Sequence, residues 1–217
     1  MKQFLVVGLG NFGYYLATHL FQKGHAVMAM DKDSALVQNI KHLVTQAVVA
    51  DATDPSVMRE LGVNELDTAV VSIGSVLGDS ILTVLNLQEA GVENIVAKAI
   101  NEPHKRILEK LGVQKISFPE RDIAISMAAQ MDNPNLIDYL PFLEDYAIIE
   151  LQVPKKFVGK TLKEINLTNS FGVQVVAIKE LDSYKMQFIP KANYALKKND
   201  VLITLGPDAG LKKLKKI

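Results

Sequence analysis

The 217-residue sequence contains no cysteine and no tryptophan, and only 6% of its residues are aromatic. Without cysteine the chain can form no disulfide and can carry out no thiol chemistry, which is compatible with a reducing cytoplasm. No apolar run approaches the roughly 18 residues of a membrane-spanning helix, and the first residues lead into an apolar segment without the pattern of a signal peptide. We therefore expect a cytoplasmic protein, soluble by itself, with a largely aliphatic core.

The formal net charge is zero, but the charges are unevenly distributed. Residues 1–150 carry 11 basic and 19 acidic side chains, whereas residues 151–217 carry 13 and 5. This asymmetry indicates two units with different histories or partners. The lysines are dispersed and no patch of arginine and aromatic residues accompanies them, so a nucleic-acid partner is not expected. The histidines show no metal-binding spacing, and no Ser/His/Asp order indicates acyl transfer.

The most informative segment lies near the N-terminus. Four apolar residues, 4–7, end in the run Gly8-Leu9-Gly10-Asn11-Phe12-Gly13, and the next residues have the apolar spacing of a helix. A buried strand, a tight turn and a helix N-terminus follow in the order of a dinucleotide-binding unit. In this interpretation Gly8 forms the turn, Gly10 lets the backbone approach a pyrophosphate, and Gly13 lets the helix pack closely on the strand. A purely structural glycine turn is the alternative.

A second apolar segment, residues 26–30, strengthens the nucleotide interpretation. It ends at Asp31, which is 18 residues beyond Gly13. An acid at this point can accept hydrogen bonds from ribose hydroxyls, and its charge repels a 2′-phosphate. Asp31 could instead simply cap the following helix.

Strand-like and helix-like segments alternate six times, which predicts an α/β protein with a Rossmann-like, doubly wound parallel sheet over residues 1–134. The expected strands are residues 4–7, 26–30, 47–50, 68–73, 94–98 and 114–118. Ligands of such sheets bind beyond the carboxyl ends of the strands. We therefore expect the following residues along one edge: Gly8–Gly13, Asp31, Asp51, Ala52, Thr53, Ile73, Gly74, Ser75 and Lys98.

The alternating pattern ends near residues 132–135, and residues 135–145 are interpreted as a linker. Residues 146–217 are rich in strand-forming segments, at residues 147–153, 173–179, 186–188 and 201–205. They predict a small α+β module. Because a domain of this size is only marginally stable alone, burial in a dimer interface is expected.

On these residues the chain resembles the RCK (regulator of K⁺ conductance) family over its whole length. The resemblance is to KtrA/KtrC/TrkA-type cytosolic subunits of bacterial Ktr and Trk potassium uptake systems, which consist of a TrkA-N and a TrkA-C module. It depends on the glycine turn, on Ala50–Asp54, on Val71–Gly74, on Lys98-Ala99, on Phe118–Asp122, on Val176–Lys179 and on Asn199–Gly206.

The resemblance implies a non-enzymatic gating subunit. Members of the family form homodimers and octameric rings beneath a membrane-embedded potassium translocator of KtrB/TrkH type, at the inner face of the cell membrane. ATP and ADP bind the N-terminal domain and favour different ring shapes, which requires different affinities for two states of the ring.

The resemblance also implies roles for individual residues. In the family the phosphates lie against Gly8, Leu9, Gly10, Asn11, Phe12 and Gly13, the ribose against Asp31, Lys32 and Asp33, and the adenine beside Asp51, Ala52 and Thr53. Ile73, Gly74, Ser75, Lys98 and His104 complete the pocket. Glu120 matches a carboxylate that helps hold a divalent cation between the γ-phosphates of a dimer. Related subunits usually have arginine at the position of Asn11, so the choice among ATP, ADP and NAD(H) stays open. Cyclic di-AMP binds some members near the segment corresponding to Asn166–Val176.

Several alternatives remain open at this point. An NAD(H)-dependent oxidoreductase would use the same glycine turn, and an RCK-type sensor could serve another cation transporter. Asp51 and Thr53 could be turn formers only, Lys98 an ordinary strand-end lysine, His104 a solvent-facing residue, and Glu120 an acid favoured at a helix N-terminus. Tyr194 and Lys198 have the spacing of short-chain dehydrogenases, but lie outside the expected nucleotide domain.

Overall fold

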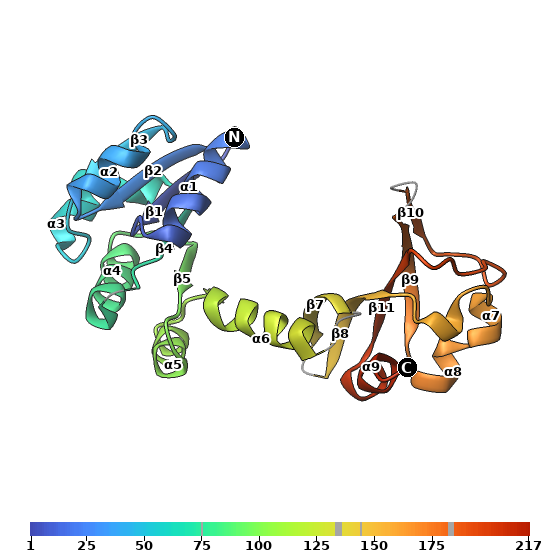
Figure 1. Ribbon diagram of the computed structural model, residues 1–217. Helices are drawn as coiled ribbons and strands as arrows, with labels where there is room; N and C mark the ends of the chain where they lie inside the picture. Colours follow the sequence, from blue (N-terminus) through green and yellow to red (C-terminus); the bar gives the residue numbers. More distant parts are fainter. Residues whose placement is uncertain (75, 133–135, 144, 182–184) are drawn as a thin grey trace. The chain divides into compact units, whose positions relative to one another are not determined.

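The computed structural model describes residues 1–74, 76–132, 136–143, 145–181 and 185–217 (Figure 1). The chain forms two compact units, Met1–Glu120 and Arg121–Ile217, and each is described by itself. The expected boundaries of the two domains, 1–134 and 146–217, stay a proposal. Among the described residues, no helix combines the length and the apolar character that crossing a membrane demands.

The first unit contains a six-stranded sheet in which every neighbouring pair is parallel. Its strands are β1 (Gln3–Val7), β2 (Ala26–Asp31), β3 (Gln46–Val49), β4 (Thr68–Val71), β5 (Ile95–Lys98) and β6 (Lys115–Ser117). Their order is β3-β2-β1-β4-β5-β6. The order reverses its direction between β1 and β4, which is the switch point where such sheets bind ligands. The predicted doubly wound sheet is confirmed.

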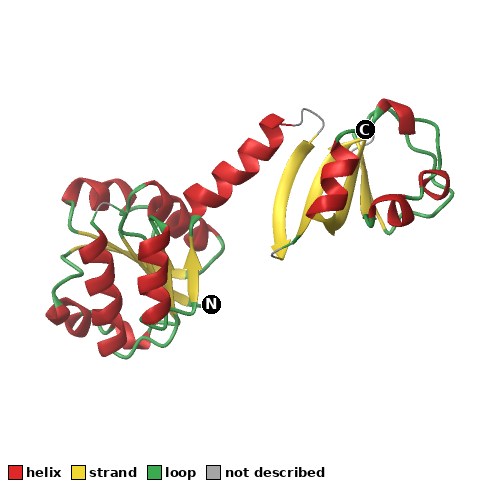
Figure 2. Cartoon of the chain, turned by 90° about the horizontal axis from the view of Figure 1, so that it is seen from below, coloured by secondary structure: helices red, strands yellow, loops and turns green. Residues whose placement is uncertain are grey.

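Helices cover both faces of this sheet, as Figure 2 shows in red and yellow. They are α1 (Asn11–Gln22), α2 (Ser34–Ile40), α3 (Pro55–Glu60), the short 3-10 helix η1 (Val63–Glu65), α4 (Leu77–Glu89) and α5 (Glu102–Lys110). Side chains of a strand alternate between faces. Accordingly, Leu5 and Val7 of β1 join a core cluster with α3, α4 and α5, whereas Val6 joins a second cluster with α1 and α2. The two clusters fix the strand ends that surround the site.

The second unit contains a five-stranded antiparallel sheet of order β10-β9-β11-β8-β7. The strands are β7 (Leu136–Leu143), β8 (Tyr146–Gln152), β9 (Gln174–Glu180), β10 (Lys185–Phe188) and β11 (Asp200–Pro207). The helical segments are η2 (Lys155–Phe157), α7 (Leu162–Ile165), α8 (Leu167–Phe171) and α9 (Asp208–Lys215). Helix α6 (Pro119–Asp132) begins at the boundary of the two units. The predicted small α+β module is confirmed.

One part of this unit was not expected from the sequence. The segment interpreted as a linker, residues 135–145, contains strand β7, which pairs with β8 from Leu136 opposite Leu151 to Leu143 opposite Tyr146. The apolar run of β7 is interrupted by Asp138 and Pro141, which hides the strand from a pattern of alternating residues. The short helix α8 was likewise missed, because its five residues are too few to show a helical period.

A buried acid organises the turn before the last strand. The carboxylate of Asp200 accepts hydrogen bonds from the Tyr194 hydroxyl at 2.9 Å and from the Lys197 backbone N–H at 2.9 Å. Burial and the Asp200 carboxylate raise the pKa of Tyr194 well above its ordinary value. The tyrosine of the dehydrogenase-like spacing therefore has a structural partner in the second unit.

Candidate functional site

A cavity of about 640 Å³ lies at the carboxyl ends of the parallel strands, a size typical of small-molecule sites. The segments that follow β1 to β4 contribute to it, together with Lys98 at the end of β5 and Glu120 after β6. Its lining residues are Val7, Gly8, Gly10, Asn11, Phe12, Asp31, Lys32, Asp33, Leu36, Ala50, Asp51, Ala52, Thr53, Ser72, Ile73, Gly74, Asp79, Lys98 and Glu120. The edge of the sheet predicted from the sequence is thus the edge where the cavity opens.

Most of the predicted site residues line this cavity, and four do not appear in its lining. Leu9 is buried in the core cluster beneath α1, and Gly13 lies within α1 against the turn. His104 is buried elsewhere in the unit. Ser75 lies outside the residues that the structure describes. The roles that we expect for these residues in ligand binding stay predictions.

The glycine turn has little room for larger residues at two positions. Gly8 adopts a φ of +89°, and a Cβ there would lie 2.9 Å from the Ile73 backbone nitrogen. A Cβ on Gly13 would overlap the Gly8 carbonyl oxygen. That carbonyl also accepts a 2.6 Å hydrogen bond from the Ser72 hydroxyl, which ties the turn to the end of β4. These contacts explain why the first and third positions of the motif, Gly8 and Gly13, have no side chain.

Gly10 has a different environment, because a Cβ there would meet nothing within 4 Å. Gly10 is the N-cap of α1, and no side chain caps this helix. The N–H groups of the first helical residues, Asn11, Phe12 and Gly13, have no carbonyl one turn before them. A helix start of this kind, with open space beside it, is suited to bind an anion.

Asp31 at the end of β2 uses both carboxylate oxygens. One accepts a 2.6 Å hydrogen bond from the Leu9 N–H, and the other accepts one of 2.9 Å from the Asp33 N–H. Asp31 therefore fixes the glycine turn from a neighbouring strand. The alternative that it caps the next helix is wrong, because the N-cap of α2 is Asp33, whose carboxylate accepts from the Ala35 N–H at 2.8 Å.

Asp51 and Thr53 form a compact turn after β3. Asp51 accepts from the Thr53 N–H at 2.9 Å and from the Thr53 hydroxyl at 2.7 Å. These two hydrogen bonds from Thr53 lower the pKa of Asp51, so the carboxylate stays ionised. Between them, the Ala52 carbonyl accepts from the Asn86 amide of α4 at 3.0 Å. The segment is thus both a well-ordered turn and part of the cavity wall.

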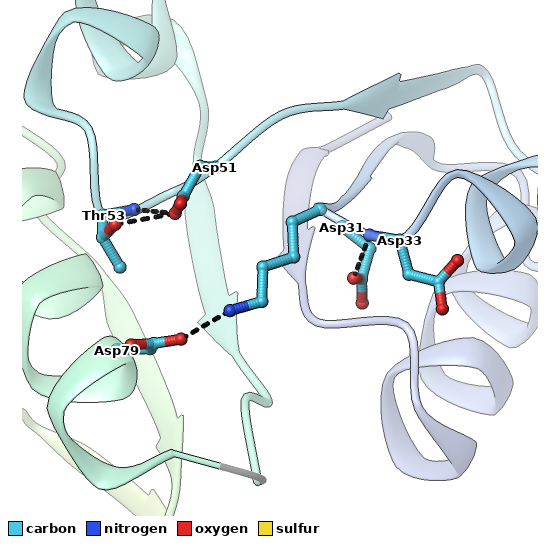
Figure 3. Close-up of polar contacts among 6 residues, drawn as sticks. Asp31, Asp33, Asp51, Thr53 and Asp79 are labelled. Atoms are coloured by element: carbon cyan, nitrogen blue, oxygen red, sulfur yellow. Dashed lines mark hydrogen bonds and ion pairs between the residues drawn. The ribbon is translucent and has the colours of Figure 1, made fainter.

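An ion pair links the segment after β2 with the first turn of α4. The Lys32 ammonium lies 2.8 Å from an Asp79 carboxylate oxygen, and Figure 3 shows this contact as a dashed line across the space beside Asp51 and Thr53. The hydrogen bond to Asp79 is the main cause that raises the pKa of Lys32; the charges of Asp51 and Asp31 add to it. Asp31, Asp33, Asp51 and Asp79 all line the cavity.

A second ion pair lies beside the glycine turn. The Lys98 ammonium contacts the Glu120 carboxylate at 2.6 Å, with side-chain exposures of 12% and 61%. The same ammonium is 6.0 Å from the centre of the Phe12 ring. The hydrogen bond from Lys98 lowers the pKa of Glu120. Lys98 is therefore a largely buried cation held next to the start of α1.

His104 does not face solvent, so that alternative is wrong. It lies in the first turn of α5, is fully buried, and its backbone N–H is capped by the Asn101 side chain at 2.8 Å. Ring atom Nδ1 is 3.4 Å from the Ile100 N–H, and Nε2 has no hydrogen-bond partner among the described residues. Burial lowers the pKa of the imidazole, which favours the neutral ring.

Sequence reasoning missed five residues that line the cavity, namely Val7, Leu36, Ala50, Ser72 and Asp79. A signal existed for Asp79, because an acid in the first turn of a helix that follows a strand lies at the same edge of the sheet. Ser72 likewise directly follows β4. Leu36 had no such signal, since only the packing of α2 decides which of its faces meets the cavity.

The second unit has a smaller cavity of about 190 Å³. It is lined by Leu162, Lys163, Asn166, Leu167, Thr168, Val173, Gln174, Val175, Pro190 and Ala192. These residues overlap the segment Asn166–Val176, where the family resemblance implies cyclic di-AMP binding, and that ligand stays a prediction. In the described part of the chain, no three or more acidic or histidine side chains gather as a metal site would need, so the metal role of Glu120 also stays a prediction.

The sequence matches two domain families. Residues 4–119 match the TrkA-N domain, and residues 146–217 match the TrkA-C domain. The first match covers nearly all of the parallel sheet and of the residues that line its cavity, and the second covers most of the antiparallel unit.

Related proteins extend over nearly the whole chain. "Ktr system potassium uptake protein C" of Bacillus subtilis is 35% identical over 215 residues, which cover 99% of this chain and 96% of that protein. "Ktr system potassium uptake protein A" of the same organism is 31% identical over 98% of this chain and 95% of that protein. The protein of the same name from Vibrio alginolyticus is 33% identical over 95% of this chain and 93% of that protein.

Solved structures agree on the fold. The GsuK RCK domain superposes with a TM-score of 0.71 at 17% identity, covering 99% of this chain and 47% of the other. The GsuK channel bound to NAD superposes with a TM-score of 0.69 at 17% identity, covering 97% and 38%. With both domains matched in order and Ktr proteins as full-length relatives, this chain belongs to the RCK family of TrkA-N/TrkA-C proteins, in the group of the Ktr and Trk potassium uptake proteins.

Proposed function

We propose that this chain is the cytosolic, nucleotide-binding regulatory subunit of a bacterial potassium uptake system of Ktr type. The observation that carries the proposal is the cavity at the switch point of the sheet, which combines an uncapped helix start with an acid at the end of β2. The full-length likeness to Ktr potassium uptake proteins supports potassium as the transported ion and a membrane-embedded translocator as the partner. The protein acts without making or breaking bonds in a substrate.

The regulatory step follows from linkage. A nucleotide shifts the subunit between two states only by binding one state more tightly, and coupling energies of this kind are typically about 1–3 kcal/mol. We expect ATP and ADP to favour different states of an assembled ring, with NAD(H) as the other adenine nucleotide to consider. The NAD-bound GsuK channel shows that an RCK fold can hold that ligand.

The two parts of the cavity suit the two halves of an adenine nucleotide. Near the glycine turn, the start of α1 and Lys98 supply donors for phosphate oxygens. Asn11 carries no charge, whereas related subunits usually have arginine at that position. We therefore expect Lys98 to supply the positive charge beside the phosphates. Beyond β2, Asp31 and Asp51 present carboxylate acceptors for ribose hydroxyls and adenine amino groups, and that of Asp51 is kept ionised by Thr53. Glu120 would share a divalent cation with the phosphates of ATP.

We also propose that the subunit assembles as a homodimer and then as an octameric ring that docks on a membrane-embedded translocator. Helix α6 exposes four apolar side chains, Ile123, Ile125, Met127 and Met131. An apolar group of this kind is typical of an interaction surface. Light scattering of the purified chain, with and without ATP, measures the mass of the assembly directly.

The decisive experiment is potassium flux through a Ktr-type translocator reconstituted with this subunit. We expect flux that differs between ATP and ADP and that depends on the subunit. Equal flux with ATP, with ADP and without the subunit would reject the proposal. Parallel calorimetric titrations with ATP, ADP, NADH and cyclic di-AMP identify the ligand of each cavity, and turnover of NADH with a carbonyl substrate would point to an oxidoreductase instead.

A further inference from the structure

The ion pair between Lys32 and Asp79 has a position that bears on which nucleotides the cavity accepts. Lys32 follows Asp31 directly, at the end of the second strand of the sheet. Asp79 comes from the first turn of α4, after the fourth strand. The 2.8 Å contact between them therefore joins two separate walls of the cavity.

In dinucleotide-binding folds, the end of the second strand distinguishes a free ribose from a phosphorylated one. An acid there accepts hydrogen bonds from the 2′-hydroxyl, whereas a basic side chain nearby accommodates a 2′-phosphate. This chain has both kinds of residue in succession, Asp31 and then Lys32. Whether the cavity accepts a 2′-phosphate therefore depends on whether the Lys32 ammonium is free to donate hydrogen bonds to it.

The surroundings of Lys32 show that the ammonium is already engaged. Its partner Asp79 is only 24% exposed, whereas the Lys32 side chain is 60% exposed, so the carboxylate is the more firmly placed of the two. Asp79 makes no other side-chain hydrogen bond or ion pair among those described. Asp31, Asp33, Asp51 and Asp79 together bring a formal charge of −4 to the cavity lining, which Lys32 reduces to −3.

We propose that Asp79 is a specificity-determining residue of the nucleotide site, because it holds Lys32 and so keeps the cavity selective for nucleotides with a free 2′-hydroxyl. The inference rests on the proposed function and adds the class of ligand that is rejected, namely adenine nucleotides with a 2′-phosphate. Without Asp79, one negative charge disappears and Lys32 gains a free donor for the phosphate oxygens.

The test is calorimetric titration of the full-length chain with two matched ligand pairs. NAD⁺ and NADP⁺ differ only in the 2′-phosphate, as do AMP and adenosine 2′,5′-bisphosphate. We expect the wild type to prefer the unphosphorylated member of each pair. In Asp79→Asn, the affinity ratio should move about tenfold toward the 2′-phosphorylated member, as expected for one new charge-assisted hydrogen bond.

Two further variants show whether the shift acts through Lys32. The double variant Asp79→Asn/Lys32→Met should return the ratio to that of the wild type. Asp33→Asn removes a neighbouring charge that Lys32 does not contact, and asparagine caps a helix as well as aspartate does. It should leave the ratio within about threefold of the wild type, since it frees no donor.

Each outcome decides the inference. An unchanged ratio in Asp79→Asn, an equal shift in Asp33→Asn, or a shift that survives in the double variant would overturn it while leaving nucleotide binding intact. If no adenine nucleotide binds the folded wild-type chain, the proposed function itself fails. Thermal unfolding of every variant confirms that the titrated protein is folded.

Discussion

Lys98 and Lys32 line different parts of the same cavity, and each forms an ion pair with one carboxylate. The two pairs are alike in length, with N–O distances of 2.6 Å and 2.8 Å, but the lysine side chains differ in exposure, at 12% and 60%. Exposed ion pairs contribute between zero and about 1 kcal/mol, because water and salt screen them. Packing beside the glycine turn therefore holds Lys98 in place, whereas Lys32 depends on its partner Asp79.

This difference assigns different tasks to the two parts. A buried cation next to an uncapped helix start is prepared for phosphate before any ligand arrives, and such preorganisation reduces the cost of binding. An exposed lysine that one carboxylate holds can exchange its partner, so it is suited to discriminate between ligands. The predictions below test this division, beginning with the largest expected effect.

The fixed part of the cavity depends on the glycine turn, so a methyl group at Gly13 should disturb it most. A Cβ there would overlap the Gly8 carbonyl oxygen and lie 2.5 Å from the Ser72 hydroxyl oxygen. We expect Gly13→Ala to lower the free energy of unfolding by about 3 kcal/mol, measured by urea denaturation.

Gly10→Ala is the matched control, because a Cβ at Gly10 meets no atom within 4 Å. We expect Gly10→Ala to lower the free energy of unfolding by less than about 1 kcal/mol, because Gly10 is an N-cap residue. It should nevertheless weaken nucleotide binding, since the methyl group enters the space beside the helix start. Equal losses of stability in the two variants would show that the turn is not constrained as described.

Asp31 connects the two parts of the cavity, because one of its oxygens holds the Leu9 N–H and the other the Asp33 N–H. Asp31→Ala should abolish nucleotide binding in calorimetry while the fold is retained. Leaving two backbone donors without their acceptor should lower the free energy of unfolding by about 2 kcal/mol.

The control for this change is Asp54→Ala. Asp54 caps α3 by accepting from the Ser56 N–H at 2.8 Å, and it is not among the residues that line the cavity. It should cost about 1 kcal/mol of stability and leave nucleotide affinity unchanged. Undiminished affinity in Asp31→Ala would contradict the ribose assignment.

The direct comparison of the two lysines uses ADP and adenosine as ligands. Lys98→Met should weaken ADP binding about tenfold, because a charge-assisted hydrogen bond to phosphate is lost, and should leave adenosine binding nearly unchanged. Lys32→Met should change either affinity by less than about threefold. If both variants lose ADP affinity equally, the two parts of the cavity have no separate tasks.

The sequence predicted the fold and most of the cavity because both depend on local signals. The Gly8–Gly13 run, the apolar strands and the acids at their ends follow from backbone conformation and from the geometry of a parallel sheet. The pairing of Asp79 with Lys32 and the burial of His104 could not be found in this way. Asp79 is bound by a residue 47 positions away, and the burial of His104 depends on how α5 packs against the sheet.

The smallest expected effect concerns pH, and it separates the two pairs. The hydrogen bond from Lys98 lowers the pKa of Glu120 below its ordinary 4.5. This pair therefore stabilises the fold above about pH 4.5 and loses that contribution as the pH falls through the lowered pKa. Since Glu120 is 61% exposed, the contribution should be below about 0.5 kcal/mol.

The other pair should respond at the opposite end of the pH range. Asp79 raises the pKa of Lys32 above 10.5, so this pair contributes below that pH and is lost as the pH rises through the raised pKa. NMR titration of the Glu120 carboxyl carbon and of the Lys32 ε-carbon measures the two pKa values. Lys98→Met should raise the pKa of Glu120 and leave that of Lys32 unchanged, and Asp79→Asn should lower the pKa of Lys32 and leave that of Glu120 unchanged. A change at both sites in either variant would mean that the two parts of the cavity are electrostatically coupled and cannot act separately.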